Sequence, residues 1–273
     1  MKKWGILTVC LVLAGSLIAG CGNKSSEQGA GQTGGKTEAK TIVLGTSADF
    51  PPYEFHKMID GKDQIVGFDI EIAKEIASDM GATLEVKDMD FKALLGELST
   101  GRVDFVISGM TPDETRRKQV DFSDNYYKAQ QAVVVREADK DKYKTMDSLK
   151  GVSFGIQTGS IQEDIAKTIP GAQITGLGKI NDIIMQLNSG RVDASIMEKP
   201  VAEAFIKNVK GLTIAEAVPE YEEDGYAIGV KKGNKELLDQ INKTLDRLKS
   251  ENKIDQFVSE AKRPRRAKIN SAT

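Results

Sequence analysis

The motif Gly-Arg-Val-Asp occurs twice in this chain, at residues 101–104 and 190–193, and both copies stand in the same local pattern. A stretch with helical apolar spacing precedes each copy, and a short apolar run, residues 103–107 or 194–197, follows it. This pattern predicts a helix, a glycine turn and a buried strand. Two such units far apart in one chain predict two α/β lobes. Because ligands of open α/β sheets bind at the carboxyl ends of strands, we expect the two strand ends to face a shared cleft.

The residues after the first copy have the chemistry of a carboxylate clamp. Ser108, Gly109, Met110 and Thr111 end the first strand, and Arg116 follows shortly after. Glycine permits close backbone approach, backbone amides donate hydrogen bonds, and a guanidinium can hold a carboxylate with two parallel bonds. The alternative is a surface turn with a solvated arginine. The second strand ends in a carboxylate, Glu198. A clamp for an anion on one lobe and a carboxylate on the other suits a zwitterion.

The N-terminus predicts export and lipid anchoring. Lys2 and Lys3 precede an apolar run over residues 6–18, which is too short to span a bilayer. The run ends in Ile-Ala-Gly-Cys21, which resembles a bacterial lipobox. We therefore expect residues 1–20 to be a lipoprotein signal peptide and Cys21 to carry the lipid, palmitate included, at the outer face of the bacterial cell membrane. A plain signal peptide with an incidental cysteine is the alternative.

Residues 21–40 are rich in Gly, Ser, Gln and Lys without apolar periodicity, which predicts a flexible tether. The body, roughly residues 41–262, is long enough for two lobes with a core each. The net charge of −2 favours neither nucleic acid nor an anionic membrane as partner. Only one histidine, His56, and one cysteine would remain in the mature chain, so we expect no disulfide, no metal site and no cofactor.

Within the first lobe, the pattern predicts a strand over residues 41–45, a loop with two prolines, and a helix over residues 70–80 with Asp69 as its N-cap. A strand over residues 83–86 and a helix over residues 92–98 follow. This βαβαβ order predicts a largely parallel sheet.

Apolar residues between 126 and 135 predict a long strand that crosses to the second lobe, and residues 226–230 predict a strand that crosses back. Helical spacing continues over residues 237–257. We expect the first lobe to comprise residues 41–132 and 227–262 and the second lobe residues 133–226. We expect the basic residues 263–273 to form a solvated tail.

In the second lobe, a strand leads to Gln157 and Ser160, which open a helix over residues 161–168. Backbone amides at a helix N-terminus favour an anion. An ordinary N-cap has the same sequence, so this alternative stays open.

Taken together, six segments resemble the extracellular solute-binding proteins for polar amino acids, the partners of ABC importers. The resemblance covers essentially all of residues 41–262, and the segments follow in this order: GTSADFPPYEF, VGFDIEIAKEIA, MDFKALLGELSTGRVDFVISGMT, Arg116 followed by DFSD, GIQTGSIQED and GRVDASIMEKPVAEAF. The resemblance implies an α/β fold of two lobes, each a mostly parallel sheet flanked by helices, joined by two crossover strands. It also implies delivery of a free L-amino acid to an ABC permease and ATPase.

By this resemblance, Arg116 and the amides of Thr111 and Ser160 hold the ligand carboxylate, and Glu198 holds the ammonium with help from Gly109 and Thr111. Related proteins often have aspartate where this chain has Glu198. Phe50 and Phe91 match positions on either side of the ligand side chain. Ser47 stands where several relatives have aspartate, while this chain has Asp49 two residues later. The full set of expected binding residues is Ser47, Asp49, Phe50, Phe91, Ser108, Gly109, Met110, Thr111, Arg116, Gln157, Ser160 and Glu198.

The residues near the expected cleft favour a basic ligand, arginine first, then lysine or histidine. Arg116 is occupied by the carboxylate, and Asp90 and Glu97 can offset Lys92, so an acidic side chain would lack a partner. Asp49 can face a ligand cation, and the two phenylalanines can stack on a guanidinium. Glutamine is the second candidate and cystine a weaker third.

Two other classes of function stay open. Some relatives of this fold are periplasmic dehydratases, which need a general acid, and Glu198 and Asp49 are the candidates. An adhesin or sensor on the same tether is the third class. A dehydration assay tests the second class, and neighbouring genes for a permease and an ATPase would favour transport.

Overall fold

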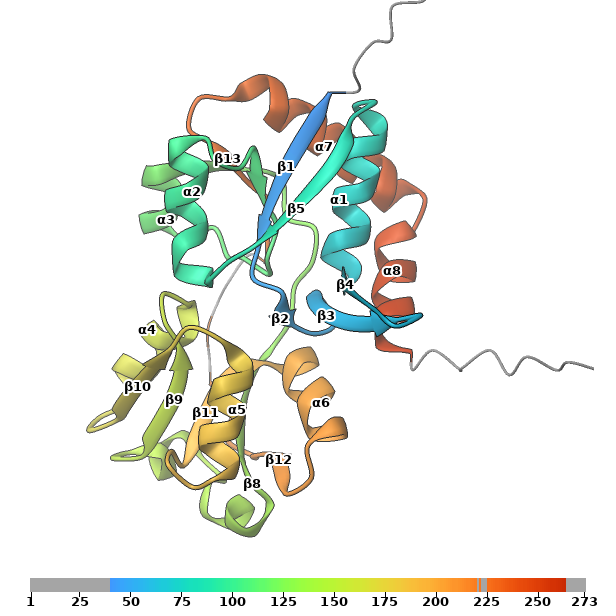
Figure 1. Cartoon of the computed structure of the whole chain (residues 1–273). Helices are drawn as coiled ribbons and strands as arrows, with labels where there is room; N and C mark the ends of the chain where they lie inside the picture. The colour runs from blue at the N-terminus through green and yellow to red at the C-terminus, as the bar shows by residue number, and fades with distance from the viewer. Residues whose placement is uncertain (1–39, 220, 222–224, 264–273) are drawn as a thin grey trace, which may run out of the picture. The chain divides into compact units, whose positions relative to one another are not determined.

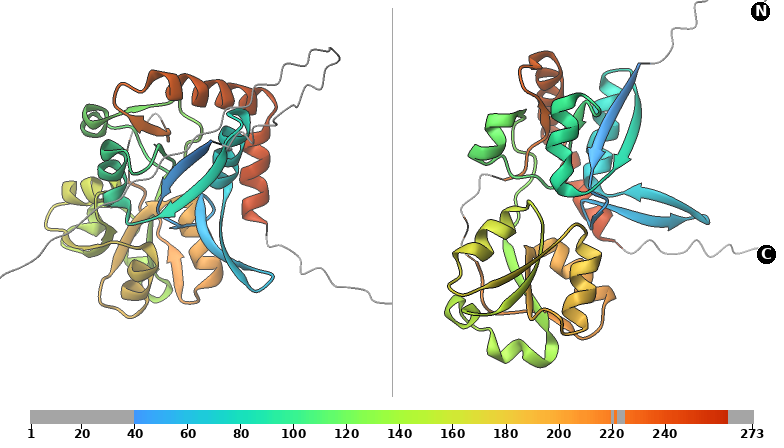
Figure 2. Two further views of the ribbon diagram at one scale, coloured as in Figure 1. Left: turned by 45° about the horizontal axis from the view of Figure 1, so that its top comes forward. Right: turned by 60° about the vertical axis from the view of Figure 1, so that its left-hand side comes forward.

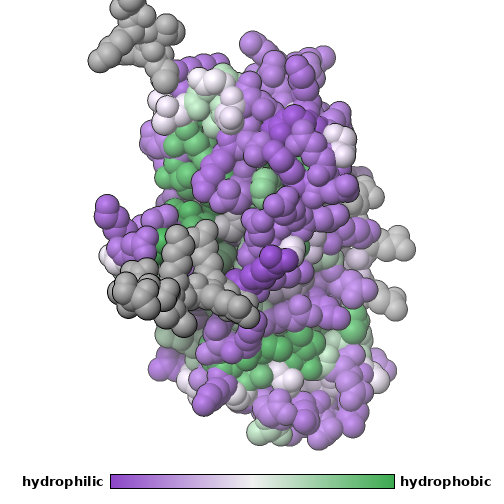
Figure 3. Space-filling view, turned by 90° about the vertical axis from the view of Figure 1, so that its right-hand side faces the viewer, coloured by the Kyte–Doolittle hydropathy of each residue, from purple (hydrophilic) through white to green (hydrophobic). Residues whose placement is uncertain are grey.

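The computed structural model describes residues 40–219, 221 and 225–263. The predicted signal peptide, the lipidation site Cys21, the tether up to residue 39 and tail residues 264–273 lie outside these ranges. Within the described ranges, no helix combines the length and the apolar character that crossing a membrane requires. The face that carries α6 (Lys199–Asn208) and α8 (Lys253–Lys262) is mostly hydrophilic, with a few hydrophobic patches (Figure 3).

The first sheet has the strand order β5-β1-β6-β13-β7. Its strands are β1 (Thr41–Thr46), β5 (Thr83–Asp88), β6 (Phe105–Val106), β7 (Val120–Phe122) and β13 (Gly229–Lys231). β1 pairs in parallel with β5 and β6, whereas β13 runs antiparallel to β6 and β7. The prediction of a parallel sheet is therefore confirmed for β5, β1 and β6, and the strands from later in the chain make the sheet mixed.

Helices cover this sheet on both sides (Figure 1). They are α1 (Phe68–Asp79), α2 (Leu94–Thr100), α3 (Glu114–Gln119), α7 (Lys235–Ser250), α8 and the short 3-10 turn η1 (Phe91–Ala93). α1 packs against α7 and α8, and α2 packs against β13 and α3. Ile72 and Ile76 of α1 are fully buried, as their helical spacing predicts. We call this sheet and its helices, residues 41–122 and 229–262, the first lobe.

The second sheet has the order β10-β9-β11-β8-β12 and lies within residues 131–214, which we call the second lobe. Its strands are β8 (Gln131–Arg136), β9 (Ser153–Gln157), β10 (Gln173–Leu177), β11 (Ala194–Glu198) and β12 (Leu212–Ile214). Its helices are α4 (Ile161–Thr168), α5 (Ile180–Asn188) and α6, with 3-10 turns η2 (Glu137–Lys142) and η3 (Met146–Leu149). β10, β9 and β11 are parallel, and β8 is antiparallel to β11 and β12. All five residues of β11 are buried, as expected of a central strand.

The two Gly-Arg-Val-Asp motifs occupy equivalent places in the two lobes. Each follows a helix, α2 or α5, and leads into a strand of its sheet, β6 or β11. Both glycines have a φ of +76°, in the left-handed region that glycine adopts readily. The valine of each motif lies against a glycine in the neighbouring strand: Val103 against Gly45, and Val192 against Gly155. The predicted repeat of helix, turn and strand is therefore present in the fold.

A small antiparallel sheet was not predicted. It consists of β2 (Asp49–Phe50), β3 (Glu54–Ile59) and β4 (Lys62–Val66), and its hairpin extends beside α8 (Figure 2). The prediction of Asp69 as the N-cap of α1 is wrong, because Gly67 is the N-cap. A Cβ atom at Gly67 would lie 1.9 Å from the carbonyl oxygen of Tyr53, so only glycine fits there. The side chain of Asp69 is instead buried inside the lobe.

The chain crosses between the lobes twice, after β7 and after β12. Strand structure in the first crossing begins only at Gln131, so the long strand predicted from residue 126 is wrong at its start. Tyr127 and Tyr226 form an isolated bridge where the two crossings run side by side. The long helix predicted over residues 237–257 is two helices, α7 and α8, interrupted at Asn252 with a φ of +54°. The lobe boundaries at residues 132 and 226 stay predictions.

Candidate functional site

A pocket between the lobes brings together the predicted binding residues, with the exception of Met110. The first lobe contributes Ser47, Asp49, Phe50, Glu54, Phe91, Ser108, Gly109, Thr111 and Arg116, and the second contributes Gln157, Ser160, Ile161, Gln162 and Glu198. The side chain of Met110 is 1% exposed and belongs to the apolar core around Leu94 and Leu98. Two strands position these groups. β6 leads into the turn of Ser108, Gly109 and Thr111, and β11 ends in Glu198.

Arg116 is held in place by both lobes. Its Nη1 donates to the carbonyl oxygen of Thr111 at 2.7 Å, and its Nη2 donates to the carbonyl oxygen of Gly159 in the second lobe at 2.9 Å. Nε lies 3.2 Å from Oδ2 of Asp113, the N-cap of α3. The guanidinium lies over the ring of Phe91, 5.5 Å from its centroid. Burial lowers the pKa of Arg116, and the Asp113 carboxylate opposes this effect, so the side chain stays cationic.

The opposite wall of the pocket carries a buried carboxylate. Glu198 is 2% exposed and stands where β11 ends and α6 begins. Its Oε1 accepts a hydrogen bond of 2.9 Å from Nε2 of Gln162, and the same nitrogen lies 3.0 Å from Oε1 of Gln131. Glutamine side chains from α4 and β8 therefore fix the orientation of this carboxylate.

Gln157 and Ser160 form the turn between β9 and α4. Ser160 is the N-cap of α4: its Oγ accepts from the amide of Glu163 and donates to the carbonyl oxygen of Gln157. The amide of Ser160 points to the same carbonyl at 3.2 Å. The capping alternative is thus realised, and Ser160 is also one of the residues that line the pocket.

Asp49 is a buried carboxylate that contacts the second lobe. Its Oδ2 accepts a hydrogen bond of 2.5 Å from the amide of Ile180, the first residue of α5, and its Oδ1 lies 3.3 Å from Oγ of Ser47. Burial raises the pKa of Asp49 to about 6, although the Ile180 amide and Lys179 lower it in part. The carboxylate faces the pocket and the N-terminus of α5 together.

Phe50 and Phe91 are both almost buried and both line the pocket. Phe50 packs on Tyr53, with ring centroids 5.0 Å apart. Gly109 lies directly against Phe50: a Cβ atom there would lie 2.9 Å from Cε1 of the ring. Gly109 also has a φ of +50°, so the turn needs glycine for its backbone conformation and for the space beside the ring.

Glu54 and Asp69 form a buried acidic pair beneath the clamp residues. Oε1 of Glu54 accepts from Oγ of Ser108 at 2.5 Å, and Oδ2 of Asp69 accepts from the amide of Gly109 at 3.0 Å and from the Tyr126 hydroxyl at 2.9 Å. Burial raises the pKa of Glu54 well above its usual range, and the neighbouring Asp69 raises it further. Burial and the neighbouring Asp69 therefore both favour the neutral form of Glu54.

Three pocket residues were missed by sequence reasoning: Glu54, Ile161 and Gln162. Glu54 follows Pro-Pro-Tyr in a segment read as a loop, and it begins β3 instead. A charged residue inside an otherwise apolar segment was the signal available for it. Gln162 lies in the first turn of α4, where a polar residue ordinarily faces solvent, and gave no signal.

Comparisons with known proteins show the family to which the chain is similar. Residues 42–260 match the model of the bacterial extracellular solute-binding proteins, family 3. The arginine-binding extracellular protein ArtP of Bacillus subtilis is 39% identical over 264 residues, which cover 94% of this chain and 96% of ArtP.

Two solved structures are also similar. One is the amino acid ABC transporter substrate-binding protein AbpA of Streptococcus pneumoniae bound to L-arginine, with a TM-score of 0.79 and 39% identity over 81% of this chain and 94% of AbpA. The other is an ancestral arginine-binding protein bound to glutamine, with a TM-score of 0.75 and 39% identity over 81% of this chain and 97% of that protein.

Proposed function

Because the chain belongs to the bacterial extracellular solute-binding proteins of family 3, we propose that it binds a free basic amino acid and delivers it to an ABC importer. Arginine is the first candidate, followed by lysine and histidine. The partners in this proposal are the permease and the ATPase of the importer, and no catalytic step is involved.

The charge balance of the pocket carries the proposal. Among the described residues that line it, three side chains are carboxylic, Asp49, Glu54 and Glu198, and one is cationic, Arg116. Burial favours the neutral form of Glu54, which leaves two carboxylates facing one guanidinium. A zwitterion with a cationic side chain complements this set: its carboxylate pairs with Arg116 and its two cations pair with Glu198 and Asp49. A ligand with an acidic side chain would place a third negative group in a buried site.

The arrangement also supports the roles of the other pocket residues. Phe50 and Phe91 line the pocket, and a ligand guanidinium that lies over an aromatic ring gains about 0.5–2 kcal/mol. Ser47, Ser108, Thr111, Gln157 and Ser160 supply polar groups for orientation. A dehydratase is disfavoured because Gln162 holds the Glu198 carboxylate as a hydrogen-bond acceptor, which suits an ammonium partner.

Glutamine is the second candidate. An amide side chain can bond to Ser47 and Asp49 without supplying a charge, and a similar ancestral protein is described as bound to glutamine. Lipidation of Cys21 and the tether over residues 21–40 complete the proposal, because they would hold the body at the outer face of the cell membrane.

The test is a competition series by calorimetry on the wild-type protein with arginine, lysine, histidine, glutamine, glutamate and cystine. We expect arginine to bind most tightly and glutamate least. Glutamine or glutamate displacing arginine would overturn the basic specificity and leave the amino-acid clamp intact. Binding of none of them would overturn the proposal as a whole.

A further inference from the structure

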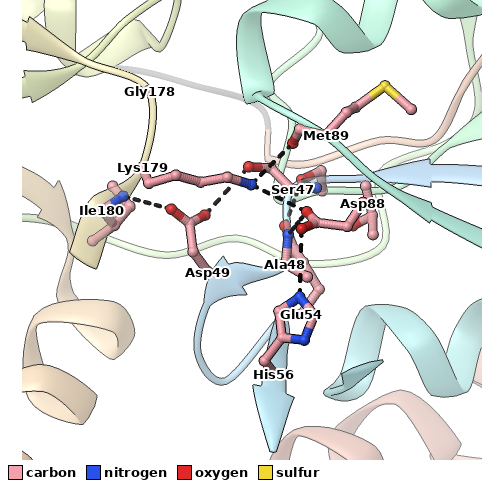
Figure 4. A network of polar contacts seen from close by, with 12 residues as sticks. Ser47, Ala48, Asp49, Glu54, His56, Asp88, Met89, Gly178, Lys179 and Ile180 are labelled. Carbon is pink, nitrogen blue, oxygen red and sulfur yellow. Dashed lines mark hydrogen bonds and ion pairs between the residues drawn. The ribbon is translucent and has the colours of Figure 1, made fainter. Parts of the chain in front are cut away.

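We propose that Asp49, Asp88 and the segment 178–180 form a latch that holds the two lobes together independently of the ligand. Three contacts between chain residues make up the latch (Figure 4). Oδ2 of Asp49 accepts from the Ile180 amide at 2.5 Å, and Nζ of Lys179 lies 3.1 Å from Oδ1 of Asp88 and 3.3 Å from the carbonyl oxygen of Met89. Asp49, Asp88 and Met89 belong to the first lobe, and Lys179 and Ile180 to the second.

The N-terminus of α5 depends on the first lobe for its cap. Its N-cap residue is Lys179, whose ammonium has donors and no acceptor, so it cannot receive the free amides of the first helical turn. Asp49 supplies this acceptor from the other lobe, and its charge faces the positive end of the helix. Separation of the lobes would therefore remove the cap from α5.

The carboxylate of Asp88, which Lys179 contacts, is also held by other residues of the first lobe. Oδ1 of Asp88 accepts from the Ala48 amide at 2.8 Å, and Oδ2 lies 3.4 Å from Nε2 of His56, whose Nδ1 lies 2.7 Å from Asp63. These bonds fix the carboxylate in the position that Lys179 meets. Because the orientation of one partner is already set, less side-chain entropy is lost when the ion pair forms.

The ion pair of Lys179 and Asp88 stands apart from the groups that line the pocket, whereas Asp49 belongs to both the latch and the pocket. Among the described residues, those that line the pocket include Asp49 but neither Lys179 nor Asp88. The side chains of Lys179 and Asp88 are each 30% exposed at the rim between the lobes. Loss of the ion pair therefore changes the population of the closed form without changing a ligand contact. Since apparent affinity scales with the fraction of closed protein, every ligand should weaken by the same factor.

An equal loss of affinity for every ligand distinguishes a latch residue from a residue that recognises the ligand side chain. The variant Lys179→Met tests this prediction. Methionine is unbranched and only one atom shorter than lysine, so the variant keeps most of the side-chain length and removes the charge. We expect arginine and glutamine to bind about two- to fivefold more weakly, by the same factor for both, as measured by calorimetry. The radius of gyration of the variant without ligand, from small-angle scattering, should exceed that of the wild type.

Lys87→Met is the matched control. Lys87 precedes Asp88 in β5, and its Nζ contacts Glu85 and the carbonyl oxygen of Arg102 within the first lobe. We expect wild-type affinity and radius of gyration. Asp88→Asn is a second test, because it keeps an acceptor for the Ala48 amide and removes the charge that Lys179 meets.

Unchanged scattering and affinity in both latch variants, with melting temperatures near the wild-type value, would overturn the latch. Weaker binding of arginine alone would show instead that Lys179 senses the ligand side chain. The affinity measurements rest on the proposed function, whereas the scattering comparison does not. If the wild type binds no amino acid, the proposed function fails and the scattering result still decides the latch.

Discussion

Arg116 combines two tasks in one side chain. It presents a guanidinium to the pocket, and its bond to the Gly159 carbonyl joins the first lobe to the second. A buried guanidinium loses hydration and is stable only when hydrogen bonds replace the lost water. The carbonyl oxygens of Thr111 and Gly159 and the Asp113 carboxylate provide that replacement. The contacts with Thr111 and Asp113 lie within the first lobe, so they orient the guanidinium before the lobes close.

Replacement of Arg116 by alanine should weaken every amino-acid ligand alike, because the proposed contact is with the carboxylate they share. A charge-assisted hydrogen bond contributes about 1.5–3 kcal/mol, so calorimetry should show a loss of roughly 10- to 150-fold. Arg117→Ala is the control: Arg117 is exposed, contacts the Pro112 carbonyl and the ring of Phe122, and should leave affinity unchanged. Wild-type affinity in the Arg116 variant would refute the clamp.

Asp49 should make the binding of arginine depend on pH. Burial raises its pKa to about 6, so the carboxyl is mostly ionised at pH 7 and mostly neutral at pH 5. A ligand cation needs the ionised form. The affinity for arginine should therefore fall as the pH is lowered from 7 to 5, by at most about tenfold per pH unit.

Glutamine serves as the internal control for this pH profile. Asp69 has a pKa near 6 as well, and its titration should affect both ligands, so the difference between arginine and glutamine isolates Asp49. In Asp49→Asn, arginine should lose far more affinity than glutamine, and the two pH profiles should become parallel. A wild-type protein whose arginine and glutamine profiles already run parallel would contradict the role of Asp49.

The sequence predicts the clamp residues because their types and order are local features: glycine, hydroxyls and an arginine directly after a strand. It does not predict the acidic pair. Glu54 and Asp69 come from separate segments, and burial together with their proximity sets their protonation. Asp69 was read as a cap because a carboxylate before a helical run ordinarily caps it. Here Gly67 makes the turn and frees Asp69 to hold the Gly109 amide.

At the scale of elements, the turn after β6 is the part of the site most restricted by its backbone. Gly109 combines a left-handed φ with direct contact to Phe50. The amide of Gly109 is bonded to Asp69, and Oγ of the preceding Ser108 donates to Glu54. Hydrogen bonds to Glu54 and Asp69 and packing against the ring of Phe50 therefore hold the turn in place.

Gly109→Ala should lower the free energy of unfolding by about 1–3 kcal/mol, because alanine disfavours this φ and its methyl group displaces Phe50. Denaturant titration measures the loss, and calorimetry should show weaker arginine binding. Gly96→Ala is the control. Gly96 lies exposed within α2 with nothing within 4 Å of an added Cβ, so the change should stabilise the fold by about 0.5–1 kcal/mol. Equal stability of the two variants would contradict this account of the turn.

Helices and strands with strong periodicity were predictable, as α4, predicted over residues 161–168, illustrates. The hairpin of β3 and β4 was missed because its exposed strand β4 has no alternation of apolar residues. The break between α7 and α8 was missed because Asn252 interrupts a pattern that stays apolar on both sides. The antiparallel pairing of β13 with β6 and β7 depends on the path of the chain back from the second lobe, and no local sequence pattern predicts that path.

At the scale of the whole molecule, the proposed anchor can be tested without the ligand. Cys21→Ser should move the protein from the membrane fraction to the medium or periplasm, because stable attachment requires more than one acyl chain on the cysteine. Cys10→Ser is the matched control, since Cys10 lies in the predicted leader and should leave the protein in the membrane fraction. Fractionation with immunoblotting gives the readout. A Cys21 variant that stays with the membrane would refute the anchor.

The position of β13 sets an order on folding during synthesis. β13 lies between β6 and β7, yet it comes from residues 229–231, after the whole second sheet. As the chain leaves the ribosome, β7 therefore has no neighbour in its sheet until the strand that separates it from β6 has emerged. The second sheet uses residues 131–214 alone and can pair its strands earlier. The first sheet is thus the last to complete its hydrogen bonding, and the edge of β7 is the one that stays unpaired longest during synthesis.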